Sequence, residues 1–305
     1  MGMLLPNPAC NSQQGILPPW VRAVSYALQR IPTRCPGKAR LARWALGEVL
    51  QRTDVVIDAV SASFLVPHLS EPVAFHLLVN GKYEPATDEC LRTLLKSGDV
   101  FVDVGANIGV FALMAARIVG STGRIMAVEA SPKVFPYLVK NIELNGLDNI
   151  EAMHCAAVDF NSEHLSFWEA PESKFGMGAL VPQFHAAPCV VPSRTLDELL
   201  GLAGIDHVTV LKVDVEGAEA DVFRGALRLL RSFPAPIIVF EFCDWAEARF
   251  TGRRPGDAQR LLMDLGYEIW RLADRQRGCR PLCEPLVEGF EMLVAVRSQI
   301  KCAKQ

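Results

Sequence analysis

The stretch FVDVGANIG, residues 101–109, combines residue types that could bind a nucleotide-like ligand. An apolar run ends on Asp103, and Gly105 and Gly109 follow it. A strand, a glycine-rich turn and a helix open the dinucleotide-binding fold, in which the middle glycine of GxGxxG lets the backbone approach a pyrophosphate. Asn107 stands at that middle position, and a carboxylate about 5 Å from a pyrophosphate would cost about 3 kcal/mol at an effective dielectric of about 20. The stretch therefore argues against a dinucleotide.

The same acid would attract a ligand that carries positive charge. S-adenosylmethionine has an ammonium and a sulfonium group beside an adenosine, so Asp103 favours it on electrostatic grounds. Glu129 closes the next predicted strand, 24 residues after Gly105, where a carboxylate can accept hydrogen bonds from both ribose hydroxyls. Asp159, after the third strand, is a weaker candidate for the adenine amino group. Each residue alone could be a helix cap or a solvated strand end, and their order and spacing are what predict a cofactor site.

A second group of charged residues lies in the segment VLKVDVEGAEADVFRG. Strand alternation puts Lys212, Asp214 and Glu216 on one face. A structural account would pair the lysine with a carboxylate inside a covered parallel sheet. The functional account, which we favour, places both acids at the carboxyl end of the strand, where ligands bind in open α/β sheets, with Glu241 at the end of the next strand. We predict Asp214, Glu216 and Glu241 as catalytic residues.

Two kinds of chemistry remain open for these acids. One of them could be a general base, and His185 is a rival for that role because its ordinary pKa lies near neutrality. Alternatively, Asp214 and Glu241 could bind a divalent metal ion. An all-oxygen set would suit Mg²⁺.

The elements that must position these residues follow a regular alternation from residue 99 onward. Short apolar strands alternate with helices of about 10 to 15 residues, which indicates right-handed βαβ units and a parallel sheet covered on both faces. We predict strands at 99–104, 123–130, 149–158, 207–215, 236–242, 266–272 and 290–296, with helices at 109–119, 131–146 and 218–231.

Two segments depart from this alternation. Residues 1–72 are predicted to form an N-terminal helical extension to an α/β domain at 73–305. Its first 52 residues carry seven Lys or Arg and one acid, Glu48, so it could contact an anionic partner or a membrane surface, although solvated short helices explain the charge as well. Exposed apolar helix faces there would be compatible with a homodimer. Residues at about 160–193 are predicted to be an insertion, either a lid over the site or an inert surface excursion.

The motifs VDVGANIG, AVEASP, NIELNGL and LKVDVEGAEADVFRGA resemble the FkbM family of S-adenosylmethionine-dependent methyltransferases over roughly residues 73–297. The resemblance implies a class I, Rossmann-like fold with a seven-stranded, mostly parallel sheet, S-adenosylmethionine as donor, and methylation of a hydroxyl on a natural product or sugar. Ala130 stands where the family often carries Pro. The predicted cofactor-binding residues are Asp103, Gly105, Asn107, Gly109, Glu129, Ala130 and Asp159.

The expected function is therefore O-methylation of a small-molecule hydroxyl. A catalytically silent nucleotide-binding scaffold is the alternative, and an NAD-dependent oxidoreductase is opposed by Asp103 and Asn107. Nucleic-acid methylation is opposed because the fourth strand ends in DVEG, not in the Asn-Pro-Pro-aromatic element used on flipped bases. Scattered cysteines, the absence of a membrane-length apolar run and the lack of a signal-peptide pattern predict a cytoplasmic protein.

Overall fold

The computed structural model describes residues 15–184 and 187–297. The chain divides into two compact units, which meet in the sequence between Gly81 and Lys82. The predicted boundary after residue 72 falls inside helix α3 (Pro72–Asn80). This helix belongs to the first unit because it packs against β2 and α1 of that unit.

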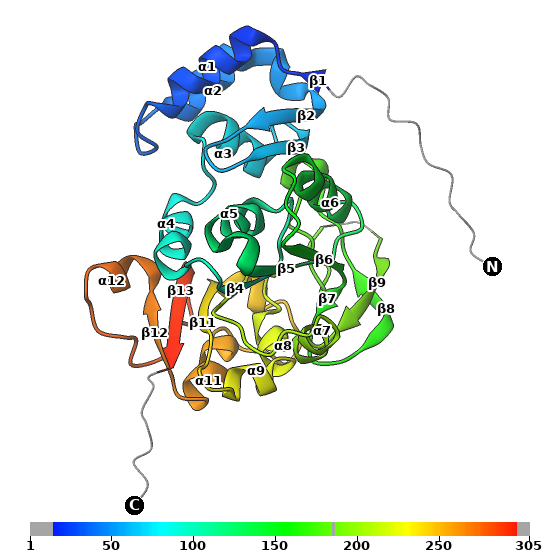
Figure 1. Ribbon diagram of the computed structural model, residues 1–305, viewed down its shortest axis with the longest axis vertical. Coiled ribbons are helices and arrows are strands. Elements are labelled where there is room, and N and C mark those ends of the chain that lie inside the picture. The colour runs from blue at the N-terminus through cyan, green and yellow to red at the C-terminus, as the bar shows by residue number, and fades with distance from the viewer. Residues whose placement is uncertain (1–14, 185–186, 298–305) are drawn as a thin grey trace, which may run out of the picture. The chain divides into compact units, whose positions relative to one another are not determined.

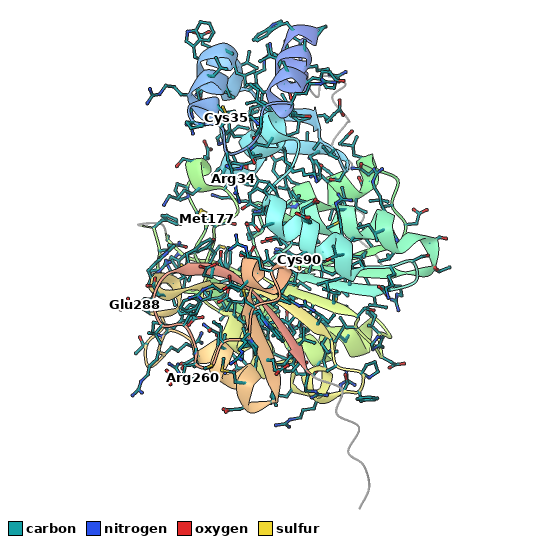
Figure 2. All side chains as sticks on the ribbon, turned by 90° about the vertical axis from the view of Figure 1, so that its left-hand side faces the viewer. Arg34, Cys35, Cys90, Met177, Arg260 and Glu288 are labelled. Atoms are coloured by element: carbon teal, nitrogen blue, oxygen red, sulfur yellow. The ribbon has the colours of Figure 1, made fainter. Side chains whose placement is uncertain are left out.

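The first unit contains a sheet as well as the predicted helices. Helices α1 (Pro19–Gln29) and α2 (Lys38–Leu46) lie side by side (Figure 2), and the 3₁₀ helix η1 (Gly47–Gln51) follows them. Strands β1 (Gly15–Ile16), β2 (Thr53–Asp58) and β3 (Ser63–His68) form a three-stranded sheet. Val55 and Ile57 alternate with exposed or half-buried neighbours along β2, which is the period of a half-buried strand. The extension is therefore not purely helical.

The second unit is built on a seven-stranded sheet with the order β12-β13-β11-β10-β4-β5-β6. Only β13 runs antiparallel to its neighbours within this described sheet. The predicted class I methyltransferase-like fold is confirmed. The strands are β4 (Val100–Val104), β5 (Arg124–Glu129), β6 (Ile150–His154), β10 (Val210–Val213), β11 (Ile237–Cys243), β12 (Tyr267–Arg271) and β13 (Phe290–Arg297).

Helices cover both faces of this sheet (Figure 1). Alternate strand residues enter two separate cores, as the two-residue period of a strand requires. Phe101 and Val239 pack toward one layer of helices, whereas Val102 and Phe240 pack toward the other. The first layer contains α4 (Pro85–Leu94), α5 (Val110–Val119), α6 (Phe135–Leu144) and α12 (Leu272–Gln276); the second contains α7 (Leu196–Leu202), α8 (Glu219–Arg224), α9 (Leu227–Arg231) and α11 (Asp257–Asp264). The second unit also contains three short helices: η2 (Gly120–Thr122), η3 (Glu172–Lys174) and α10 (Asp244–Glu247).

Two predicted elements are interrupted. The helix predicted at 218–231 is split into α8 and α9 around Gly225. A Cβ at this position would lie 2.1 Å from the carbonyl oxygen of Val158, so the close approach requires glycine. The strand predicted at 149–158 ends at His154, and the chain continues as β7 (Ala156–Ala157) in another sheet. That sheet has the order β7-β9-β8, and β8 (Ser162–Phe167) and β9 (Cys189–Arg194) come from the predicted insertion.

Candidate active site

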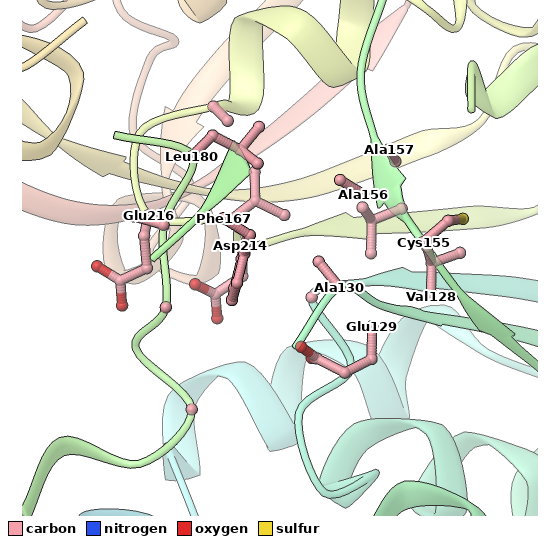
Figure 3. A pocket seen from close by; sticks show the side chains of 17 residues that line it. Val128, Glu129, Ala130, Cys155, Ala156, Ala157, Phe167, Leu180, Asp214 and Glu216 are labelled. Atoms are coloured by element: carbon pink, nitrogen blue, oxygen red, sulfur yellow. The ribbon is translucent and has the colours of Figure 1, made fainter. Parts of the chain in front are cut away.

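A pocket lies at the carboxyl ends of β4, β5 and β10, between the sheet and the insertion (Figure 3). It encloses about 550 Å³ of space not filled by atoms, its open mouth included. The lining residues are Val104, Gly105, Val128, Glu129, Ala130, Cys155, Ala156, Ala157, Phe167, Gly176, Gly178, Ala179, Leu180, Asp214, Val215, Glu216 and Ala218.

The glycine turn after β4 brings two strand ends into close contact. Gly105 has φ +80°, and a Cβ there would lie 1.8 Å from the carbonyl oxygen of Asp214. Only glycine can occupy this position without displacing the backbone of the neighbouring strand. Gly109 has a different role, since a Cβ on it would meet Leu113 at 2.7 Å. It allows close helix packing and is not among the described residues that line the pocket.

Glu129 is held in place by backbone donors. Its Oε2 accepts a hydrogen bond of 2.8 Å from the backbone N–H of Asn107, and its Oε1 accepts one of 2.9 Å from that of Ser131. Burial raises the pKa of this carboxyl to about 7. A carboxylate has about four lone-pair sites, so two of them remain for ligand hydroxyls. Glu129 lies across the pocket from Asp214 and Glu216 (Figure 3).

Asp103 does not occupy the position predicted for it. Its side chain is fully buried, and its Oδ1 lies 3.4 Å from Lys212 Nζ. The strand register places the two residues side by side on β4 and β10, so both side chains leave the same face of the sheet. Among the described residues, Asp103 is not part of the pocket lining. Asp103 is therefore engaged in an internal ion pair with Lys212, and its contact with a cationic ligand stays a prediction.

Asp159 is also displaced from the pocket. Its Oδ2 lies 3.3 Å from Nε of Arg224, and both side chains are partly exposed. The chain leaves the large sheet after His154, which carries Asp159 away from the described pocket lining. Cys155 and Ala156 take its place along this wall. Sequence reasoning missed them because small apolar residues carry no chemical signal.

Asp214 and Glu216 are brought together at one end of the pocket (Figure 3). Asp214 Oδ2 accepts a hydrogen bond of 3.1 Å from Lys212 Nζ, which is almost fully buried and lies 5.1 Å from the ring centre of Phe111. Burial would lower the pKa of Lys212, but the carboxylates of Asp214 and Asp103 raise it above its usual value. Lys212 is therefore a permanent buried cation.

Glu216 differs from Asp214 in both backbone and charge environment. Its φ of +56° is unusual for a non-glycine residue. Burial, followed by the charge of Asp214, raises its pKa to about 7. A carboxyl with this pKa can exchange a proton near neutrality, which is a requirement for general acid–base catalysis.

Glu241 lies behind these two acids. The register of β10 and β11 pairs Val213 with Phe240, so Glu241 is next to Asp214. It is 7% exposed and is absent from the described lining of the pocket. Burial raises its pKa well above the usual value, and Asp214 raises it further. Glu241 can influence the pocket acids by its charge, but a ligand in the pocket would first meet Asp214 and Glu216.

Glu84, just before α4, was missed by sequence reasoning. Burial and then the charge of Asp214 raise its pKa, whereas Lys212 lowers it. The residue precedes Pro85 at a helix start, and this local pattern is typical of ordinary helix beginnings. Nothing in its surrounding sequence signals a place near the acids of β10.

The predicted Mg²⁺ site does not fit these contacts. No group of three or more His, Cys, Asp or Glu within residues 15–184 and 187–297 is arranged to hold a metal ion. Asp214 already contacts the ammonium group of Lys212, which would compete with a cation. His185, the rival base, lies outside the described residues.

The insertion supplies one wall of the pocket through Phe167, Gly176 and Leu180. It is attached to the loop after β5, because Ser131 Oγ donates hydrogen bonds of 2.8 and 2.9 Å to the carboxylate of Glu169. A Cβ on Gly176 would lie 2.2 Å from Nδ2 of Asn107. The insertion therefore contacts both the glycine turn and the loop that carries Glu129.

The family model of the methyltransferase FkbM domain matches residues 103–269, more than half of the chain. This chain belongs to the FkbM methyltransferase family. The match covers the glycine turn, Glu129 and the three acids at 214, 216 and 241, and it begins after Glu84. In the part of the chain that the structure describes, no helix is both long and apolar enough to cross a bilayer.

Three relatives of this chain are methyltransferases by name. The chain is 33% identical over 158 residues to Methyltransferase 1 of Beauveria bassiana. The aligned region covers 45% of this chain and 63% of that protein. The chain is 29% identical over 221 residues to Methyltransferase sdnD of Sordaria araneosa, with coverage of 61% and 80%. It is 26% identical over 189 residues to the hexuronic acid methyltransferase AglP of Haloferax volcanii, with coverage of 60% and 72%.

Proposed function

We propose that this protein uses S-adenosylmethionine to methylate a hydroxyl group on a small molecule, either a natural product or a sugar. The observation that carries the proposal is that carboxylates with different surroundings lie on opposite sides of one pocket. Glu129, with its backbone donors, occupies one side, and Asp214 and Glu216 occupy the other. Family membership supports methyl transfer, and the hexuronic acid methyltransferase among the relatives supports a sugar as one class of acceptor.

The residues present fit an adenosine-containing cofactor. Glu129 has lone pairs left for ribose hydroxyls, and Val128, Ala130 and Ala156 provide apolar surface beside it. Val104, Gly105 and Asp214 line the pocket where β4 and β10 end. When bound, S-adenosylmethionine supplies a methyl group on a sulfonium centre, which an oxygen nucleophile can take up by in-line displacement.

The acids on the other side would act on the acceptor. Asp214, held by Lys212 through Oδ2, has Oδ1 left to accept a hydrogen bond from an acceptor hydroxyl. Glu216 has a pKa of about 7 and can take the proton that the hydroxyl releases. Orientation of the two reactants can contribute about 7 to 11 kcal/mol, and a positioned base about 10² to 10⁴ in rate. Loss of the base should therefore leave measurable activity.

Calorimetric titration tests the cofactor assignment without knowledge of the acceptor. S-adenosylhomocysteine and, separately, NAD would be titrated into the wild-type protein, Glu129→Ala and the control Glu143→Ala, which changes an exposed carboxylate on α6. We expect micromolar binding of S-adenosylhomocysteine to the wild type and the control, and loss of binding in Glu129→Ala. Binding of NAD, or of neither ligand, would contradict the proposal.

The acceptor class is tested by transfer of a labelled methyl group. A panel of sugars and small hydroxylated molecules would be incubated with labelled S-adenosylmethionine, and the products treated with alkali to distinguish stable ethers from esters. An alkali-stable methyl ether is the expected product. A labelled ester, or label on nitrogen, would show that the acceptor is not a hydroxyl.

A further inference from the structure

The outward face of α2 combines apolar and basic side chains. Trp44 is 81% exposed and Leu41 is 46% exposed, and Arg40 is also exposed on the same helix. Ala42 and Leu46, four residues apart, form the buried side of α2. Positions 40, 41 and 44 are neighbours on the helix surface because residues three and four apart share a face. We call Arg40, Leu41 and Trp44, together with the exposed Arg34 of the preceding loop, the basic aromatic face.

The charge of this part of the chain is strongly positive. Six Lys or Arg and one acid, Glu48, lie between Pro19 and Gln51. Four of the six cations have partners inside the first unit. Lys38 Nζ donates to Ile31 O and Asn80 Oδ1, and Arg43 lies over the ring of Phe75. Arg22 pairs with Asp58, and Arg30 contacts Tyr26. Arg34, in the loop between α1 and α2, and Arg40 are exposed to solvent. The basic aromatic face is therefore cationic at its edge.

Helix α1 adds further exposed aromatic surface beside α2. Trp20 and Tyr26 are 48% and 61% exposed, and the Arg30 guanidinium lies over the Tyr26 ring. A single exposed apolar residue is ordinary on a protein surface. Here two tryptophans and a tyrosine occur with exposed arginines on two helices that pack together.

We propose that the first unit docks on an anionic lipid surface through the basic aromatic face. Tryptophan side chains favour the boundary between headgroups and acyl chains, because one part of the ring system is apolar and the indole N–H is polar. Arginines near an anionic membrane add electrostatic attraction. The basic aromatic face thus combines apolar insertion with electrostatic attraction, and a peripheral membrane-binding surface needs both.

The same charges disfavour the other occupants. A second copy of the chain on this face would bring Arg34 and Arg40 toward their own counterparts, and like charges facing each other across an interface are costly. Nucleic acid would match the charge but would leave the aliphatic side chain of Leu41 without an apolar environment. A lipid surface satisfies both the arginines and the apolar residues.

Vesicle cosedimentation of the full chain tests this proposal. Vesicles of equal parts phosphatidylcholine and phosphatidylserine should sediment the wild-type protein, whereas pure phosphatidylcholine should not. The double variant Leu41→Ser with Trp44→Ser should bind about tenfold more weakly, and Arg34→Gln with Arg40→Gln should weaken binding and reduce its dependence on salt. The control Leu202→Ser removes an exposed leucine of α7 in the second unit and should bind as the wild type does.

Three results would overturn the proposal. Equal binding by the double variant and the Leu202→Ser control would show that the basic aromatic face is not involved. Failure of the wild type to bind anionic vesicles would exclude lipid docking. Sedimentation velocity that reveals a wild-type dimer abolished by Trp44→Ser would identify a self-association surface instead. Circular dichroism and thermal unfolding of each variant would separate these results from loss of fold.

Discussion

The ammonium group of Lys212 lies 3.1 Å from Oδ2 of Asp214, so a buried cation holds one oxygen of a pocket carboxylate. The same ammonium lies 3.4 Å from Oδ1 of Asp103. Asp103 is fully buried beside this ammonium group. Lys212 therefore balances two acids, of which only Asp214 contacts the pocket.

Replacement of Lys212 by Met should destabilise the fold. Removal of one partner from a buried ion pair leaves an uncompensated charge and costs about 3 to 5 kcal/mol. Lys96→Met, which changes an exposed lysine after α4, is the matched control and should have little effect. Urea unfolding of the two variants checks the difference. A Lys212→Met protein as stable as the control would show that Asp103 and Asp214 do not depend on the cation.

Replacement of Gly105 by Ala should damage both the fold and the pocket. The added Cβ would lie 1.8 Å from the Asp214 carbonyl oxygen in a backbone of φ +80°, and we expect a loss of about 3 kcal/mol or more. Gly146→Ala is the control, because φ there is +59° but no atom lies within 4 Å of the added Cβ. It should cost only the strain, about 1 kcal/mol. Thermal unfolding and titration of S-adenosylhomocysteine would measure both effects.

The raised pKa of Glu216 predicts a pH dependence of stability. Its pKa rises from 4.5 to about 7 on folding, so between these values the folded state binds more protons than the unfolded state. The stability that this group contributes is complete below pH 4.5 and is lost as pH rises to about 7. Glu216→Gln cannot titrate, so its free energy of unfolding should fall less than that of the wild type across this window. Parallel slopes for the two proteins would contradict the assignment.

Metal removal should leave ligand binding unchanged. Asp214 contacts Lys212 where a divalent cation would have to bind, so we expect the same affinity for S-adenosylhomocysteine after EDTA treatment and after addition of Mg²⁺. Calorimetry under both conditions checks this expectation. A tenfold loss of affinity on chelation, restored by Mg²⁺, would show that a metal ion takes part in the site.

The order of strands and helices in the second unit could be predicted from the sequence. Each strand of the large sheet was predictable because its apolar residues are short runs bounded by turns, and the glycine turn located the pocket. Gly105 and Glu129 were found in this way, and both line the pocket. These features depend on local chain geometry, which the pattern of residue types along the chain predicts directly.

The orientation of individual side chains was harder to predict. Asp103 was expected to face a ligand because it precedes the turn, but its neighbour Lys212 belongs to a strand more than 100 residues later. The pairing depends on how β4 and β10 align in the sheet, and the sequence around either residue does not indicate this alignment. The need for glycine at position 225 has the same origin, because it comes from the close approach of Val158. Long-range contacts of this kind also explain why Glu84 was missed.

The wall formed by Phe167 and Leu180 comes from one continuous stretch outside the large sheet. Residues of this stretch can change without altering any strand that carries Glu129 or Asp214. Substitutions within this one stretch could therefore change the shape of the pocket for an acceptor while the strands that carry Glu129 and Asp214 keep their sequence. Glu169 is the exception within this stretch, because it accepts the hydrogen bond from Ser131 that attaches the insertion to the loop after β5.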